Sequence, residues 1–126
     1  MISQILDKLY VGDIWFSESE LAPRGIGHVV NVSGAELSLK CQYTHIHLRD
    51  DGHNQPSDFA TVLATIEDSL SRGWGTLVCC RAGMSRSVFI VMLWLERMGM
   101  SREEAYAFVK QRHPIAQVNP DLWRSL

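Results

Sequence analysis

The chain has 126 residues, 46% of them hydrophobic, which is enough for one domain with its own core and too few for a second. A formal net charge of −2 supplies no broad basic surface, so nucleic acid is not an expected partner. No secretory leader pattern opens the sequence and no apolar stretch is long enough to span a bilayer, so we expect no membrane partner and a cytoplasmic location. Three cysteines without a C-x-x-C pair also favour a reducing compartment.

Strand-like and helix-like segments alternate along the chain, which is typical of a layered α/β domain. Apolar and β-branched residues predict a short strand or edge hairpin at 4–11, a buried strand at 26–32 and an alternating strand at 43–48. Between the first two, Ser17 and Glu20 form a capping box for a brief helix.

The second half of the chain is predicted to be rich in helix. In chain order we expect a helix over 58–72 capped by Ser57, a strand over 74–79, a helix over 87–98, a helix from the Ser101 cap to about 112, and a short helix that begins at Asn119 and Pro120. The helix over 87–98 is apolar nearly all round, so it is expected in the middle of the molecule.

Cys80 and Arg86 stand six positions apart, where the strand pattern gives way to a helix pattern. The small residues between them allow a tight turn, and a loop that enters a helix N-terminus points backbone N–H groups at one place. Those donors and the positive end of the helix dipole suit a tetrahedral dianion and favour a thiolate at Cys80. Arg86 adds a planar, permanently charged fork for two phosphate oxygens.

With this loop in place, the chain resembles the dual-specificity family of cysteine-dependent protein phosphatases. The resemblance covers nearly the whole chain and is carried by KLYVG at 8–12, GHVVNV at 27–32, IHLRD at 46–50, CRAGMSRS at 80–87, and RHP at 112–114 with NP at 119–120. It implies one catalytic domain over 1–126, built on a central mixed, mostly parallel sheet of four to five strands flanked by helices. It also implies a monomer.

The resemblance further implies a phosphomonoester hydrolase that acts on phosphotyrosine and on phosphoserine or phosphothreonine in a phosphorylated protein or peptide substrate. Cys80 would attack phosphorus and carry the phosphoryl group as phosphocysteine, which splits one difficult displacement into two easier ones. The loop that holds the phosphate oxyanion would consist of Arg81, Ala82, Gly83, Met84, Ser85 and Arg86.

The leaving oxygen needs a proton, and Asp50 and Asp51 compete for the role of general acid. In the family the acid follows an alternating strand and precedes an aromatic residue of the next helix by nine positions, which fits Asp50 with Phe59. Some related small phosphatases place the acid immediately before glycine, which would select Asp51 beside Gly52. We prefer Asp50.

Two further residues are expected to support the site. Ser87 would donate a hydrogen bond to the departing thiolate, and Asn119 would fix the backbone near the site. The resemblance implies no metal or other cofactor. His45 and His47 share a predicted strand face but lack a third ligand at a persuasive spacing, which favours a polar strand face over a metal site.

Cys79 is a departure from the family pattern, which usually has histidine before the nucleophile. Cys79 is either a small buried apolar residue at the strand end or a partner that traps an oxidised Cys80, for which Cys41 would compete. Two alternatives stay open, of which only the first follows from Cys79. One is a phosphate-binding module with weak catalysis, and the other is a phosphatase of non-protein substrates such as phosphoinositides or RNA 5′ triphosphates.

Overall fold

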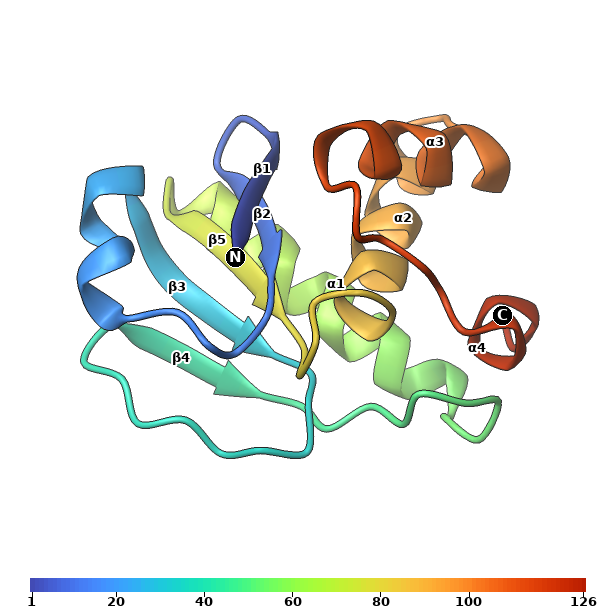
Figure 1. The fold of residues 1–126 in the computed structure, drawn as a ribbon, viewed down its shortest axis with the longest axis horizontal. Helices are drawn as coiled ribbons and strands as arrows, with labels where there is room; N and C mark the ends of the chain where they lie inside the picture. Colours follow the sequence, from blue (N-terminus) through green and yellow to red (C-terminus); the bar gives the residue numbers. More distant parts are fainter.

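Five strands form one mixed sheet in the order β1-β2-β5-β3-β4 (Figure 1). The computed structural model describes residues 1–126 and places the strands at Ile2–Leu6 (β1), Leu9–Gly12 (β2), Ile26–Asn31 (β3), Gln42–His45 (β4) and Gly75–Cys79 (β5). Only β1 is antiparallel to its neighbour, since β2, β5, β3 and β4 all run parallel. The expected mixed, mostly parallel sheet is confirmed, and the first segment is the expected edge hairpin.

Four helices and two 3-10 turns complete the fold. They are η1 (Glu18–Glu20), η2 (Ala22–Arg24), α1 (Pro56–Ser71), α2 (Arg86–Arg97), α3 (Arg102–Arg112) and α4 (Pro120–Arg124). In Figure 1, α2, α3 and α4 gather on one side of the molecule and β4 forms the opposite edge. None of these helices combines the length and the apolar character that crossing a membrane requires.

The two faces of the sheet bury two separate cores. The larger one lies between the sheet and the helices and includes the apolar faces of α1 and α2 and the strand residues Val11, Val30 and Val78. The smaller one lies on the other face under the 3-10 turns and loops, and its buried members are Tyr10, Leu21, Ile26, Val29, Leu77 and Cys79. Because side chains alternate along a strand, Cys79 faces the smaller core and Cys80 the larger one.

Several predicted element boundaries are wrong by a few residues, and the start of α1 has a clear cause. Ser57 does not cap it, because the helix begins at Pro56 behind the N-cap Gln55, whose capping box is closed by Asp58. Proline suits the first helical position, since its fixed φ fits the helix and its missing N–H would have no helical partner there.

The other boundary errors are small. The brief helix is two 3-10 turns, and α2 runs from Arg86 to Arg97 instead of 87–98. The strand predicted at 43–48 ends at His45, although the chain continues alongside β3 through hydrogen bonds from Ile46 N to Asn31 O (2.9 Å) and from Leu48 N to Val32 O (3.0 Å).

The topology brings the chemically important loops to one edge of the sheet. Since β2, β3, β4 and β5 are parallel, their carboxyl ends lie at the same edge, and loops that follow such ends commonly form binding sites in α/β proteins. The loop after β5 leads from Cys80 into α2, and the extended segment after β4 leads to Asp50. The candidate site is therefore assembled where these two segments meet.

Candidate active site

The segment from Cys80 to Ser85 turns sharply between β5 and α2, and glycine makes the turn possible. Gly83 has a φ of 70°, and a Cβ added there would lie 2.8 Å from the backbone N of Asp13 and from the carbonyl carbon of Gly12. The loop is held at its start as well, because Cys80 N donates to Gly12 O over 3.2 Å. The end of β2 thus packs against the loop and holds its conformation.

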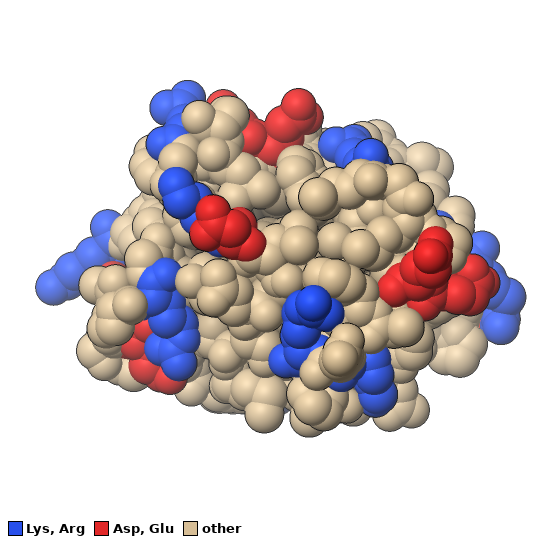
Figure 2. All heavy atoms as spheres, turned by 90° about the horizontal axis from the view of Figure 1, so that it is seen from above, with Lys and Arg blue, Asp and Glu red and all other residues tan.

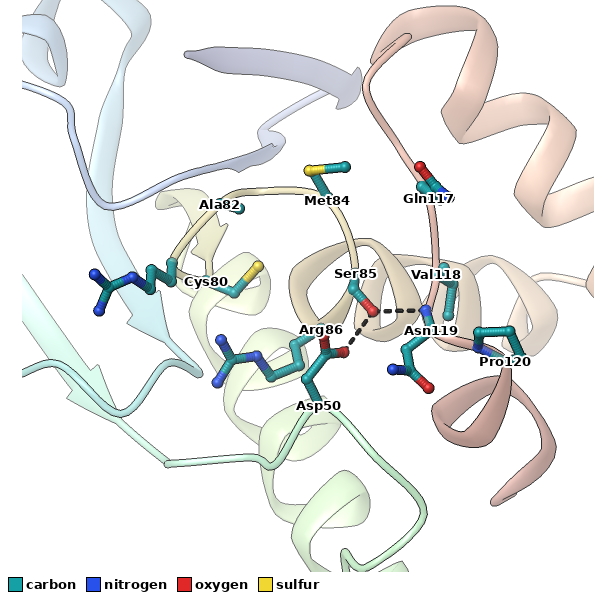
Figure 3. A pocket seen from close by; sticks show the side chains of 11 residues that line it. Asp50, Cys80, Ala82, Met84, Ser85, Arg86, Gln117, Val118, Asn119 and Pro120 are labelled. Carbon is teal, nitrogen blue, oxygen red and sulfur yellow. Dashed lines mark hydrogen bonds between the residues drawn. The ribbon is translucent and has the colours of Figure 1, made fainter.

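The loop encloses one side of a cavity of about 440 Å³. Figure 3 shows the loop opposite the segment 117–120, with Asp50 reaching in from the segment after β4. The residues that line the cavity are Asp50, Cys80, Arg81, Ala82, Met84, Ser85, Arg86, Gln117, Val118, Asn119 and Pro120. The structure therefore brings together the predicted nucleophile, arginine and preferred acid, and all of the predicted phosphate loop except Gly83, which is buried and does not line the cavity.

Cys80 is almost fully buried, with 2% of its surface exposed. Its Sγ lies 3.1 Å from the Oγ of Ser87, one residue into α2. Ser87 is completely buried and also lies 3.5 Å from Gly12 O. A hydroxyl at this position can donate a hydrogen bond to the sulfur when the sulfur is a negatively charged thiolate.

Arg86 is the first residue of α2, and its guanidinium is oriented by the extended segment after β4. Its Nη1 donates to Leu48 O over 3.1 Å. No carboxylate forms an ion pair with Arg86 or with Arg81. The positive charge of Arg86 is consequently available to an anion in the cavity.

Asp50 is tied to the phosphate loop through Ser85. The Ser85 hydroxyl donates to Asp50 Oδ1 over 2.6 Å and accepts from the backbone N of Asn119 over 2.8 Å (Figure 3). Asn119 in turn caps α4, since its Oδ1 accepts from Asp121 N over 2.8 Å. One hydroxyl therefore fixes the carboxylate, the loop and the start of the last helix relative to one another.

Asp51 has other partners and does not line the cavity. Its carboxylate pairs with Arg49 Nη2 at 2.9 Å and accepts from the backbone N of His53 at 2.8 Å. The hydrogen bond from Arg49 is the main reason that the pKa of Asp51 is lowered to about 2, and the His53 N–H adds to it. A carboxyl with this pKa is ionised near neutral pH and holds no proton to donate.

Cys79 is fully buried in the smaller core, on the opposite face of the sheet from Cys80. Burial is the main reason that the pKa of the Cys79 thiol is strongly raised, so Cys79 stays a neutral thiol. Cys41 packs against the same smaller core, and all three cysteines are free. The geometry favours the reading of Cys79 as a buried apolar residue over that of a redox partner for Cys80.

His113 contacts the loop from beneath and was not recognised from the sequence as a site residue. It is fully buried at the C-terminal end of α3, and its Nε2 donates to Gly83 O over 2.6 Å. Since Nε2 carries the proton, Nδ1 accepts from the Ser3 hydroxyl of β1 over 2.7 Å. The only sequence signal for this role was its place in the RHP segment of the family resemblance.

Of the segment that follows α3, only Asn119 was expected at the site, and its neighbours Gln117, Val118 and Pro120 also line the cavity. Gln117 N donates to Met84 O over 2.8 Å. The NP motif at 119–120 was the only sequence signal near them, and Gln117 and Val118 had none, because their position depends on how the chain returns to the loop after α3.

Charged side chains are distributed in small groups on the face shown in Figure 2, with basic and acidic residues interspersed. That face carries no continuous basic surface, in agreement with the net charge of −2. On this face, therefore, no broad basic surface is available to attract phosphate.

Comparison with known proteins agrees with the fold and with this arrangement. The family model for the dual specificity phosphatase catalytic domain matches residues 10–126, so the chain belongs to the dual specificity phosphatase family. Human dual specificity protein phosphatase 14 is 31% identical over 132 residues, which cover 99% of this chain and 67% of that protein. Human dual specificity protein phosphatase 9 is 32% identical over 118 residues, which cover 86% of this chain and 31% of that longer protein.

Solved structures show the same fold. The crystal structure of human DUSP28 superposes with a TM-score of 0.87 at 25% identity, covering 98% of this chain and 91% of that one. The chain thus has the fold and the family membership of a protein tyrosine/dual-specificity phosphatase, and this membership implies a phosphorylated substrate and binding of an oxyanion.

Proposed function

We propose that this protein hydrolyses phosphate monoesters on tyrosine and on serine or threonine of proteins, through a phosphocysteine formed on Cys80 and without a metal. The observation that carries the proposal is the cavity itself. The cavity is lined by a buried cysteine, an arginine without a carboxylate partner and a carboxylate that is hydrogen-bonded to the loop. The loop that carries the cysteine leads directly into the N-terminus of a helix.

In the first step the Cys80 thiolate attacks phosphorus, and the bond from phosphorus to the substrate oxygen breaks. Backbone N–H groups of the loop and the Arg86 guanidinium bind the equatorial oxygens, where the charge of the transition state is spread. Asp50, in its protonated form, donates its proton to the leaving oxygen. The products of this step are the dephosphorylated residue and phosphocysteine.

In the second step water attacks phosphocysteine, and Asp50, now ionised, accepts a proton from that water. The bond between sulfur and phosphorus breaks, and inorganic phosphate forms. The sulfur leaves as a thiolate, and the Ser87 hydroxyl at 3.1 Å stabilises it by a hydrogen bond. Both steps use the same carboxylate in opposite protonation states.

Hydrolysis of an aryl phosphate tests this proposal, with Cys80→Ser as the variant that removes the nucleophile. Wild-type protein is expected to release phosphate, and Cys80→Ser is expected to release none above background while keeping its affinity for phosphate. Acid quenching during turnover should give a protein heavier by one phosphoryl group, with the modification on Cys80. Release of phosphate by Cys80→Ser would contradict the mechanism.

Action on both kinds of phosphoresidue is supported by the size of the chain, because 126 residues leave little material for long recognition loops that would deepen the cavity around phosphotyrosine alone. The corresponding measurement compares a phosphotyrosine peptide with the phosphothreonine peptide of the same sequence. Turnover of both is expected, and turnover of the tyrosine form alone would restrict the proposal to tyrosine.

The replacement of the usual histidine by Cys79 favours a second candidate, a module that binds phosphate with weak catalysis. The side chain of Cys79 lies in the smaller core, so no ionisable group takes the place of that histidine. A phosphopeptide that binds without a burst of phosphate release would support this candidate. We prefer catalysis, because His113 supplies an imidazole hydrogen bond to the loop from another element.

A phosphatase of non-protein substrates is less well supported. The loop between Arg81 and Arg86 contains no lysine, which lipid-directed relatives tend to carry. We further propose that the protein acts as a monomer in the cytoplasm, a reducing compartment in which its three free thiols would persist.

A further inference from the structure

A second cavity adjoins the first and shares two arginines with it. It measures about 300 Å³ and is lined by Ser33, Gly34, Ala35, His47, Arg81 and Arg86. Arg81 and Arg86 line both cavities, so the two cavities are adjacent and share these two residues. The proposed mechanism uses the side chain of Arg86 but only the backbone of Arg81, and it does not use His47.

The lining of this second cavity is basic and contains no carboxylate. Glu36, the residue after Ala35, is engaged elsewhere, since its Oε2 pairs with His45 Nδ1 at 2.8 Å. Arg81 is exposed and forms no ion pair. His47 is also exposed, and an imidazole can donate an N–H in either protonation state.

The wall formed by residues 33–35 is fixed by a buried polar network. Asn31 Nδ2 donates to Ala35 O over 2.6 Å, and Asn31 Oδ1 accepts from both the backbone N (2.9 Å) and the hydroxyl (2.7 Å) of Ser33. Asn31 and Ser33 are fully buried. At Gly34 the wall lies so close to the His47 ring that an added Cβ would be 3.0 Å from Nε2. This part of the second cavity is therefore preformed in the absence of substrate.

We propose that this second cavity is a subsite for an acidic group of the substrate, a carboxylate or a second phosphoryl group near the residue whose phosphate is removed. Arg81 and His47 bind that group while Arg86 holds the reacting phosphate. The inference rests on the proposed function, since it assigns a specificity to the same site. It identifies the substrate as a phosphopeptide segment rich in negative charge.

The test compares kcat/KM for phosphopeptides that differ only in one neighbouring residue. Glutamate, phosphoserine or glutamine is placed in turn at each of the two positions on either side of a phosphotyrosine. For at least one position, wild-type protein is expected to prefer the acidic peptides over glutamine by roughly five- to tenfold, the range of a partly exposed ion pair with hydrogen bonds. The two acidic arms distinguish a carboxylate subsite from a phosphoryl subsite.

The ratio between acidic and neutral peptides within each variant isolates the subsite from any change in overall rate. Arg81→Gln is expected to bring the ratio close to one, and His47→Gln to reduce it at least twofold. Raising the salt concentration should lower the wild-type ratio, because exposed charges are screened. The control is Arg97→Gln at the far end of α2, which should keep the wild-type ratio and the wild-type aryl phosphatase activity.

Two failures are distinguishable. A protein that does not hydrolyse a small aryl phosphate would overturn the proposed function. A protein that hydrolyses the aryl phosphate but shows equal kcat/KM for all peptides would overturn the subsite alone.

The control variant can also overturn the subsite. If Arg97→Gln loses the preference for acidic peptides as Arg81→Gln does, the preference comes from the overall charge of the protein. Faster turnover of a short-chain phosphoinositide bisphosphate than of every peptide would reject a peptide as the occupant.

Discussion

The buried imidazole of His113 donates from Nε2 to the carbonyl oxygen of Gly83 over 2.6 Å, and so links the end of α3 to the positive-φ glycine of the phosphate loop. Removing it in His113→Ala leaves a buried carbonyl without its donor and opens a cavity under the loop. We expect kcat/KM for an aryl phosphate to fall at least tenfold and the free energy of unfolding to fall by about 2 kcal/mol. Steady-state kinetics and urea unfolding measure the two effects.

Two further variants separate the hydrogen bond from the packing. Glutamine places an Nε2 donor near the position of the imidazole nitrogen, so His113→Gln should recover most of the activity. Ser3→Ala removes the donor to Nδ1 that keeps the proton on Nε2, so it should lower kcat/KM less than His113→Ala does. If His113→Gln is as inactive as His113→Ala while both are folded, the hydrogen bond is not the reason for the loss.

The contrast between His113 and Cys80 shows what the sequence could predict. Cys80 and Arg86 belong to one short segment whose strand-to-helix pattern dictates the turn, so local chemistry was enough to find them. Asp50 was preferred over Asp51 because its place after a strand and nine positions before Phe59 matches the family pattern. His113 acts on Gly83 from 30 residues away, and Ser3 from 110 residues away from His113. Such contacts depend on how α3 packs beside β1, which periodicity does not encode.

The proposal of Asp50 as the general acid rests on a comparison of two neighbouring carboxylates. Asp50 lines the cavity and is held by Ser85, whereas Asp51 is held by Arg49 with its pKa at about 2. We expect Asp50→Asn to lower kcat for a phosphotyrosine peptide by roughly 10²- to 10⁴-fold, the usual contribution of a general acid. Asp51→Asn should lower it less than about fivefold. Equal losses in the two variants would contradict the assignment.

Ser87 is expected to matter in the second step more than in the first. Its hydroxyl lies 3.1 Å from Cys80 Sγ, where it can stabilise the thiolate that leaves phosphocysteine. In Ser87→Ala we expect hydrolysis of phosphocysteine to become rate-limiting, with kcat reduced by roughly tenfold or more and a burst of leaving-group release equal to the enzyme concentration. Rapid-mixing kinetics with an aryl phosphate detects this burst. A steady-state trace without a burst, at a reduced kcat, would place the effect in the first step.

Gly83 tests the geometry of the loop itself. Alanine at this position is strained by the φ of 70°, and its Cβ would lie 2.8 Å from the backbone at Gly12 and Asp13. Gly83→Ala is therefore expected to displace the loop and to remove nearly all phosphatase activity. The matched control is Gly25→Ala, which has a similar φ of 73° but no atom within 4 Å of the added Cβ. It should lower stability slightly and leave kcat/KM within about twofold.

The stability of the fold should depend on pH through its buried histidines. Burial lowers the pKa of His113, with the Gly83 hydrogen bond opposing it, and burial also lowers the pKa of His28. As pH falls below about 6.5, these side chains take up protons in the unfolded chain before they do so in the native protein. The free energy of unfolding should therefore be highest above pH 6.5 and decline below it, by at most about 1.4 kcal/mol per pH unit for each histidine.

Urea unfolding between pH 7.5 and 5.0 measures this decline, and His113→Gln removes one of the two titrating groups. The slope below pH 6.5 should be smaller in His113→Gln than in the wild type. His45 works in the opposite direction, because hydrogen bonds to Ser33 O and Glu36 raise its pKa, and His45→Gln should therefore steepen the decline. An identical slope in wild type and His113→Gln would show that His113 takes up its proton equally well in the native protein, in conflict with its buried hydrogen bonds.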